Sequence, residues 1–111
     1  MSIAAGAISF GDAYWPRFGA RWLASIERAD PQPDQVLLVS DRELDVPSWV
    51  QLVVVSSERR LMLMNDFADH CRCDWWVFAG LDDEYTADAF TPIVSDADAV
   101  FFPCQQAGEA M

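Results

Sequence analysis

Three consecutive acidic residues, Asp82, Asp83 and Glu84, directly follow an apolar run and are the side chains best suited to chemistry. The run before them, Trp75 to Phe78, has the aromatic and β-branched character of a short, fully buried strand, and Gly80 then breaks it. Adjacent carboxylates at the carboxyl end of such a strand can hold a hard divalent cation that a diphosphate completes. A solvated acidic turn leading into a helix is the alternative interpretation.

The rest of the chain predicts strands and helices in alternation. Apolar runs of strand length occupy Ala4 to Phe10, Gln35 to Ser40, Trp49 to Val55 and Ala99 to Pro103. Helices are expected from Pro16 to Ala29, from Glu58 to about Arg72 and, more briefly, from Thr86 to Ile93. We expect residues 104–111 to form a loose end.

Strands that are apolar throughout are typical of a sheet covered on both faces. We therefore expect an α/β fold, a Rossmann-like three-layer α/β/α sandwich with a mostly parallel sheet, in one domain spanning residues 1–111. Right-handed crossovers would bring the ends of the first, second and fourth strands to one side. Gly11–Asp12, Ser40–Asp41 and Asp82–Asp83 would then line one crevice.

The chain has 18 acids against seven arginines and no lysine, which gives a formal net charge of −11. This charge argues against a protein that binds nucleic acid through its phosphates, and an anionic ligand would need a divalent metal or a group of arginines. No apolar run approaches the roughly 18 residues of a membrane span, and no basic region precedes the apolar N-terminus. We therefore expect no membrane span and a cytoplasmic location.

The three cysteines, Cys71, Cys73 and Cys104, are too sparse for a disulfide scaffold, which fits thiols in a reducing compartment. The sequence His70-Cys71-Arg72-Cys73 also invites interpretation as a zinc site, or His70 as a catalytic base. The spacing differs from the usual C-x₂-C knuckle, and a histidine at a helix end is more often a cap.

The order of these motifs resembles the nucleotide-binding half of a GT-A glycosyltransferase, especially of the family 2 type. SFGD at Ser9 to Asp12 is similar to the first nucleotide-contacting loop of the family, and LLVSD at Leu37 to Asp41 to its base-contacting strand end. Asn65 matches the helix asparagine and stands at the family-like distance from WVFAGLDDEY at Trp76 to Tyr85. We expect the acceptor-binding half, with the usual general base, to lie beyond Met111.

The resemblance implies a role for each candidate residue. Asp82 and Asp83 would ligate Mg²⁺ or Mn²⁺ bridging the diphosphate of a nucleotide sugar. Asp41 would accept hydrogen bonds from the base, Asp12 would contact the ribose or diphosphate, and Asn65 would contact the ligand. The structural alternatives are a strand-end turn for Asp41, a helix-start acid for Asp12 and a solvated helix face for Asn65.

Three positions depart from the family pattern. Gly80 occupies the place of the first metal-motif acid, Ser40 that of the first of two base-contacting acids, and Phe67 that of a common glycine. The departure at Gly80 bears most directly on the predicted ribose and metal binding, because it removes one carboxylate from the motif. Arg17 and Arg21 follow the first loop and could face phosphates, although exposed arginines on a helix need no ligand.

These observations predict a glycosyltransferase-like domain that binds a nucleotide-diphosphate sugar with a divalent metal and is incomplete for transfer by itself. The rival is a noncatalytic assembly protein, because half of a GT-A sheet would leave an apolar edge that a homo-oligomer or a partner subunit must cover. An unrelated Rossmann-like nucleotide domain is a third interpretation, although neither G-x-G-x-x-G nor G-x-x-x-x-G-K-[ST] occurs.

Overall fold

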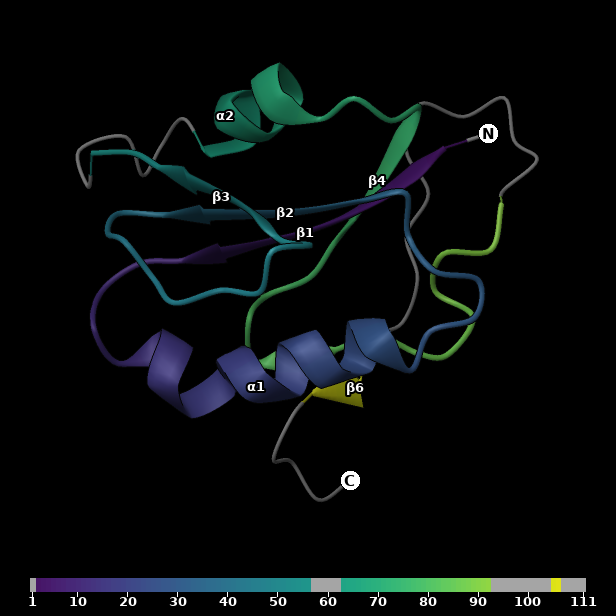
Figure 1. Ribbon diagram of the computed structural model, residues 1–111, viewed down its shortest axis with the longest axis horizontal. Coiled ribbons are helices and arrows are strands. Elements are labelled where there is room, and N and C mark those ends of the chain that lie inside the picture. The colour runs from purple at the N-terminus through teal and green to yellow at the C-terminus, as the bar shows by residue number, and fades with distance from the viewer. Residues whose placement is uncertain (1, 57–62, 93–104, 107–111) are drawn as a thin grey trace.

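A computed structural model describes residues 2–56, 63–92 and 105–106 of the chain. Its centre is a four-stranded, all-parallel sheet in the order β3-β2-β1-β4 (Figure 1). The strands of this sheet are β1 (Ile3–Ser9), β2 (Gln35–Ser40), β3 (Gln51–Val54) and β4 (Trp75–Phe78). The helices are α1 (Tyr14–Glu27) and α2 (Leu63–His70), and β5 (Asp83–Glu84) pairs antiparallel with β6 (Gln105–Gln106). The predicted α/β class and parallel sheet are confirmed, and a Rossmann-like class is compatible with them.

The strands are apolar on both sides because the sheet has a helix near each face, α1 on one side and α2 on the other (Figure 1). Alternate residues of β1 and β2 therefore enter different cores. Ile3, Ala5 and Ala7 belong to the cluster that contains α1 residues. Leu37 and Val39 of β2 pack instead with Phe67 of α2. This period of two is what the strand geometry imposes.

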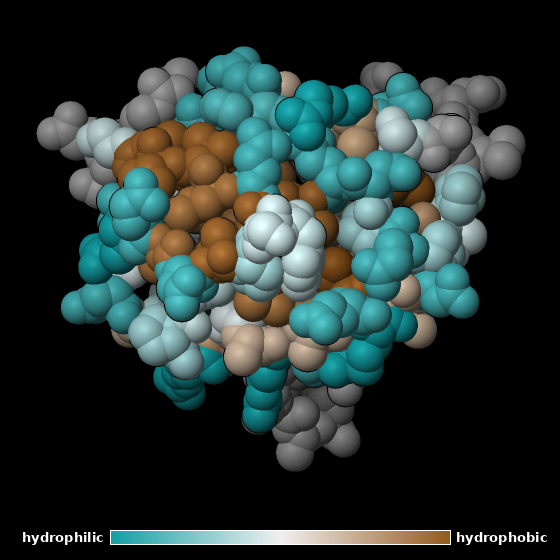
Figure 2. Space-filling view, in the orientation of Figure 1, coloured by the Kyte–Doolittle hydropathy of each residue, from teal (hydrophilic) through white to brown (hydrophobic). Residues whose placement is uncertain are grey.

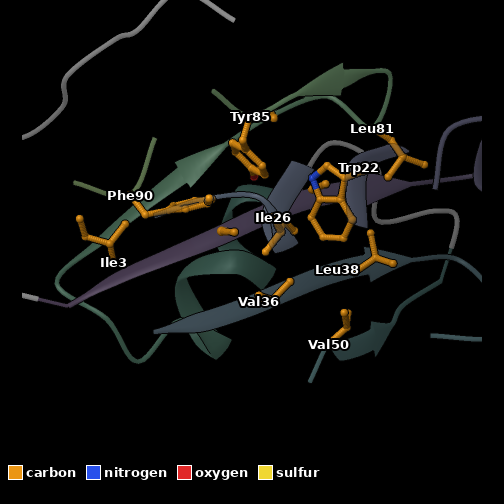
Figure 3. Close-up of a cluster of buried hydrophobic side chains, with 13 residues drawn as sticks. Ile3, Trp22, Ile26, Val36, Leu38, Val50, Leu81, Tyr85 and Phe90 are labelled. Atoms are coloured by element: carbon orange, nitrogen blue, oxygen red, sulfur yellow. The ribbon is translucent and has the colours of Figure 1, made fainter. Parts of the chain in front are cut away.

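The core on the α1 side is built around Trp22 and Ile26, which are 0% and 1% exposed. Both side chains point from α1 toward the strands (Figure 3). Tyr85 and Phe90, from the segment after β4, complete this core, and their rings lie 4.8 Å apart between centroids. The acidic segment is therefore tied to the sheet through its apolar residues.

The core on the α2 side depends on the absence of a side chain at Gly6. A Cβ atom at Gly6 would meet the ring of Phe67, which is fully buried. The rings of Trp76 and Phe78 of β4 flank Phe67 at centroid distances of 6.3 and 5.6 Å. Glycine in the middle of a central strand thus allows α2 to approach the sheet closely.

The parallel link between β2 and β3 is made without a helix. Residues 41–50 run back along the face of the sheet that α1 covers (Figure 1), and Leu44 and Val46 pack against the core there. Parallel neighbours usually need a crossover of a dozen or more residues, commonly helical. Here a shorter extended segment with two apolar anchors suffices.

Several predicted elements differ in the structure. Residues 86–92 form successive turns, with Ala89 N–H donating to Thr86 and Thr91 N–H to Asp88, so the helix predicted there is wrong across these residues. Strand β4 is only half-buried because, in the described part of the chain, it pairs with β1 alone. The loose end predicted for residues 104–111 is interrupted by β6. The strand predicted at residues 99–103 lies outside the described residues.

Two predicted helices begin at other residues. Helix α1 begins at Tyr14 rather than Pro16, since proline is tolerated anywhere in a first turn. Helix α2 is described from Leu63, and residues 57–62 lie outside the described ranges. None of the described helices is long and apolar enough to cross a membrane.

Candidate functional site

The carboxyl ends of β1 and β2 are joined by a carboxylate. Ser9 and Ser40 are paired in the sheet, and the chain turns away immediately after each of them. The Gly11 N–H donates to both carboxylate oxygens of Asp41, at 3.2 and 3.3 Å. Gly11 has a φ of +84°, a conformation that favours glycine, so the turn that presents its N–H depends on this residue.

Arg42 completes this cluster. Its Nε donates to Asp41 Oδ1 at 3.1 Å, while the Asp41 side chain is only 8% exposed. Hydrogen bonds from Arg42 and from Gly11 N–H hold the pKa of the Asp41 carboxyl below its usual value, against the opposing effect of burial. The hydrogen bond to Asp41, together with the negative charges of Asp41 and Asp12, in turn raises the pKa of Arg42. The structure thus brings Asp12, Asp41 and Arg42 into one electrostatic cluster.

The contacts of Asp41 give it a structural role at the strand end, as the alternative interpretation of this residue predicted. Both of its oxygens accept from Gly11 and Arg42. The base of a nucleotide could donate to these oxygens only if it shared them with Arg42 or displaced the exposed Arg42 side chain. Asp12 is exposed and precedes Ala13, the residue at the N-cap of α1. Ligand contacts of Asp12 and Asp41 stay predictions.

The carboxylates of Asp82 and Asp83 converge over Gly80. A Cβ atom at Gly80 would lie 2.9 Å from Asp82 Oδ1 and 3.2 Å from Asp83 Oδ2. Between Gly80 and Asp82, the buried Leu81 side chain points into the core and fixes this turn (Figure 3). Gly80, which has no side chain, therefore leaves the space that these two carboxylates occupy.

The acidic segment then follows α1 toward the C-terminal end of that helix. Glu84 lies 3.5 Å from Arg28, and Asp30 N–H donates to the Ala87 carbonyl at 2.8 Å. This end of α1 lies toward the amino ends of the strands, whereas Gly11 and Asp41 lie at their carboxyl ends. Of the three loops predicted to line one crevice, the structure joins those at Gly11 and Asp41 by hydrogen bonds, and a crevice that also includes Asp82–Asp83 stays a prediction.

A divalent cation fits the donor chemistry of Asp82 and Asp83. Mg²⁺ is commonly held by one or two carboxylates, with phosphate and water oxygens completing the shell. Within the described residues, no three His, Cys, Asp or Glu side chains group as a metal site. A cation here would therefore depend on oxygens that a ligand brings.

The remaining candidates are distributed over the two helices. Asn65 is exposed near the start of the described part of α2, where a solvated helix face was the alternative interpretation. Arg17 and Arg21 are exposed on α1, and the Arg17 guanidinium lies 5.0 Å from the centre of the Phe18 ring. These positions agree with surface arginines that need no ligand.

The His-Cys segment supports structure in this chain. His70 Nδ1 lies 2.9 Å from the Asp66 carbonyl oxygen in the last turn of α2, as expected for a helix-end histidine. The Cys71 and Cys73 thiols lie 3.8 Å from the Cys73 carbonyl and from Gln35 Oε1, respectively. Burial raises the pKa of the Cys73 thiol, which disfavours the thiolate that zinc would need.

Sequence reasoning missed Arg42 and Tyr85. Arg42 could have been suspected because it directly follows the candidate base-contacting Asp41 in a chain with few cations. Tyr85 follows the acids, and its hydroxyl accepts from Gly6 N–H at 3.1 Å and lies 2.9 Å from the Val77 carbonyl, between β1 and β4. No signal in the sequence distinguishes this buried tyrosine from a surface one.

Comparison of the chain with protein-family models, with curated proteins and with solved structures finds no match.

Proposed function

We propose that this chain is a GT-A glycosyltransferase-like domain, a truncated three-layer α/β/α sandwich that binds a nucleotide-diphosphate sugar with Mg²⁺ or Mn²⁺. The observation that carries the proposal is the joining of the β1 and β2 carboxyl ends through Gly11 and Asp41. Ligands of open parallel sheets bind at that edge. Beside this junction the Arg42 side chain is 43% exposed, and its remaining guanidinium N–H groups could donate to phosphate oxygens in a chain whose net charge of −11 otherwise repels an anion.

In this proposal Asp82 and Asp83 hold the cation, and Asp12, Asp41 and Asn65 contact the nucleotide. When bound, the cation offsets the charge on the diphosphate. Transfer by this chain alone is not proposed, because a complete reaction also needs an acceptor site and a base near the acceptor hydroxyl.

Calorimetric titration of UDP, then GDP, with and without Mn²⁺ tests this function. We expect Mn²⁺-dependent binding of one nucleotide, and Asp82→Asn should weaken that binding by about tenfold or more only when Mn²⁺ is present. Asp41→Asn should weaken binding under both conditions because it disturbs the Gly11 loop. Asp69→Asn removes an exposed acid of α2 and serves as the matched control. Equal heats in all variants, or none with either nucleotide, would refute the proposal.

The alternative function is that of a noncatalytic assembly protein that forms a homo-oligomer. Among the described residues β3 pairs only with β2, and its sequence, Gln51 to Val54, has neither a charge nor a proline to protect the outer edge. Val54 is 44% exposed, and Figure 2 shows hydrophobic side chains gathered over β3 and the segment after β2. An unprotected apolar edge of this kind favours pairing between copies.

Light scattering coupled to size-exclusion chromatography distinguishes the two functions. An assembly protein should elute as an oligomer, and Val54→Lys should shift it toward the monomer because a buried edge tolerates no unpaired charge. Tyr14→Lys, at an exposed aromatic residue of α1, is the matched control and should leave the mass unchanged. A stable wild-type monomer at all concentrations would contradict the assembly function.

A further inference from the structure

Two adjoining hollows lie at the amino ends of β2 and β3, at the edge of the sheet opposite to Gly11 and Asp41. Their volumes are about 420 and 340 Å³. Residues Asp34, Gln35, Val36 and Trp49 line both, so the hollows form one shelf with Trp49 in the lining of each. Neither hollow includes a residue of the nucleotide site proposed above.

Trp49 is the apolar platform of this shelf. It is 41% exposed, although its indole is the largest apolar side chain that a residue can offer to a ligand. A single exposed aromatic residue on a convex surface needs no explanation. An exposed indole that lines two hollows is different, because concave sites with aromatic walls and a few placed polar groups are typical of binding sites for small molecules.

The second hollow contains a fixed hydrogen-bond donor, the side-chain amide of Gln51. Gln35 Nε2 donates to Gln51 Oε1 at 2.8 Å and to the His70 carbonyl at 2.9 Å, while Gln35 Oε1 accepts from Arg72 N–H at 2.9 Å. Gln35 is therefore held by three elements, and it holds Gln51 in turn. Gln51 Oε1 accepts from Gln35, so the Nε2 amino group of Gln51 is the part of this side chain that can donate to a ligand.

The first hollow contains a fixed acceptor, the side-chain amide of Gln32. Gln32 Nε2 donates to the carbonyls of Ile26, Glu27 and Ala29 at the end of α1, at 2.8 to 3.1 Å. The Oε1 atom of Gln32 is then the part of this side chain that can accept from a ligand. A donor in one hollow and an acceptor in the other, each held by backbone or side-chain partners, thus share one indole. Little side-chain freedom remains to be lost on binding.

The charges around the shelf select against ionic ligands. Glu27 and Asp34 oppose a single arginine, Arg72, in a chain of net charge −11, so an anion would be repelled. A ligand that matches the shelf is uncharged, has an apolar face for the indole and has hydroxyl groups at its rim that both donate and accept. Pyranose rings have this combination. We propose that the shelf around Trp49 binds a neutral saccharide, independently of the nucleotide site.

Titration of the ¹⁵N-labelled chain with maltotetraose and with cellotetraose tests the proposal. The five tryptophan indole N–H signals report the site directly, and the Trp49 signal is assigned from the spectrum of Trp49→Tyr. We expect one of the two sugars to shift the Trp49 signal. Trp49→Ala should weaken binding by about tenfold, whereas Trp49→Tyr, which keeps an aromatic face, should stay within about threefold of the wild type.

Two further variants separate the shelf from a general surface effect. Gln51→Ala should weaken binding about threefold or more because it removes the fixed donor. Tyr14→Ala, at an aromatic residue that is 50% exposed on α1, should leave binding unchanged. All variants are compared at matched folded fractions from thermal unfolding.

Three results would overturn the proposal. The first is no shift of the Trp49 signal with either sugar at tens of millimolar. The second is equal weakening by Tyr14→Ala and Trp49→Ala. The third is a shift of the Trp49 signal by UDP but by neither sugar. Because Asp82→Asn leaves the shelf intact, failure of the nucleotide titration and failure of this one are distinguishable.

Discussion

Phe67→Ala should lower the free energy of unfolding by about 3–5 kcal/mol, the cost typical of removing a fully buried phenylalanine. Phe67 is 0% exposed and is the buried residue through which α2 packs on β2. Denaturant unfolding monitored by circular dichroism measures the change. Phe18→Ala, at a half-buried ring of α1, is the matched control and should cost less. A loss for Phe67→Ala no larger than that of the control would contradict the assigned role.

A double-mutant cycle with Gly6 gives the cause. Gly6→Ala alone should destabilise by about 1–3 kcal/mol because the added Cβ overpacks the site. That Cβ would meet the Phe67 ring, which Trp76 and Phe78 keep from moving aside. In the Phe67→Ala background the same substitution should cost much less. An equal cost in both backgrounds would show that the ring is not what requires glycine here.

The parts of the fold that sequence predicted well are those with strong local signals. Strands β1 and β2 and helix α1 have clear apolar runs or helical periodicity, and each was found within a few residues. Residues 86–92 were predicted as a short helix that ends near Pro92, whereas successive turns bury Phe90 against Tyr85. Tertiary packing decided the conformation there.

The candidate site was predictable in its position along the chain and less so in its contacts. A polar residue after each parallel strand indicates one edge, and Gly11 and Asp41 do meet there. That the Asp41 oxygens would bind Arg42 and Gly11 depends on side-chain directions, which spacing does not encode. Likewise, Glu84 pairs with Arg28 because the chain follows α1, a path that the sequence does not specify.

Tyr85→Phe should lower the free energy of unfolding by about 1–3 kcal/mol, because it removes the buried hydroxyl and its hydrogen bonds to backbone groups of two strands. The hydroxyl bonds Gly6 of β1 and Val77 of β4, and the residue is 7% exposed. The chain has one other tyrosine, and Tyr14→Phe, at a half-exposed position, should change stability by less than about 0.5 kcal/mol. Equal effects of the two substitutions would contradict the bridging role.

The same substitution also links the core to the proposed site. Tyr85 directly follows Asp82, Asp83 and Glu84, so its hydroxyl and the buried Leu81 hold the two ends of the acidic turn. If Asp82 and Asp83 bind the cation, loosening one end should weaken Mn²⁺-dependent nucleotide binding, while binding without Mn²⁺ stays unchanged. A Tyr85→Phe variant that is less stable but binds nucleotide as the wild type does with Mn²⁺ would mean that the acidic turn belongs to the fold and not to the ligand.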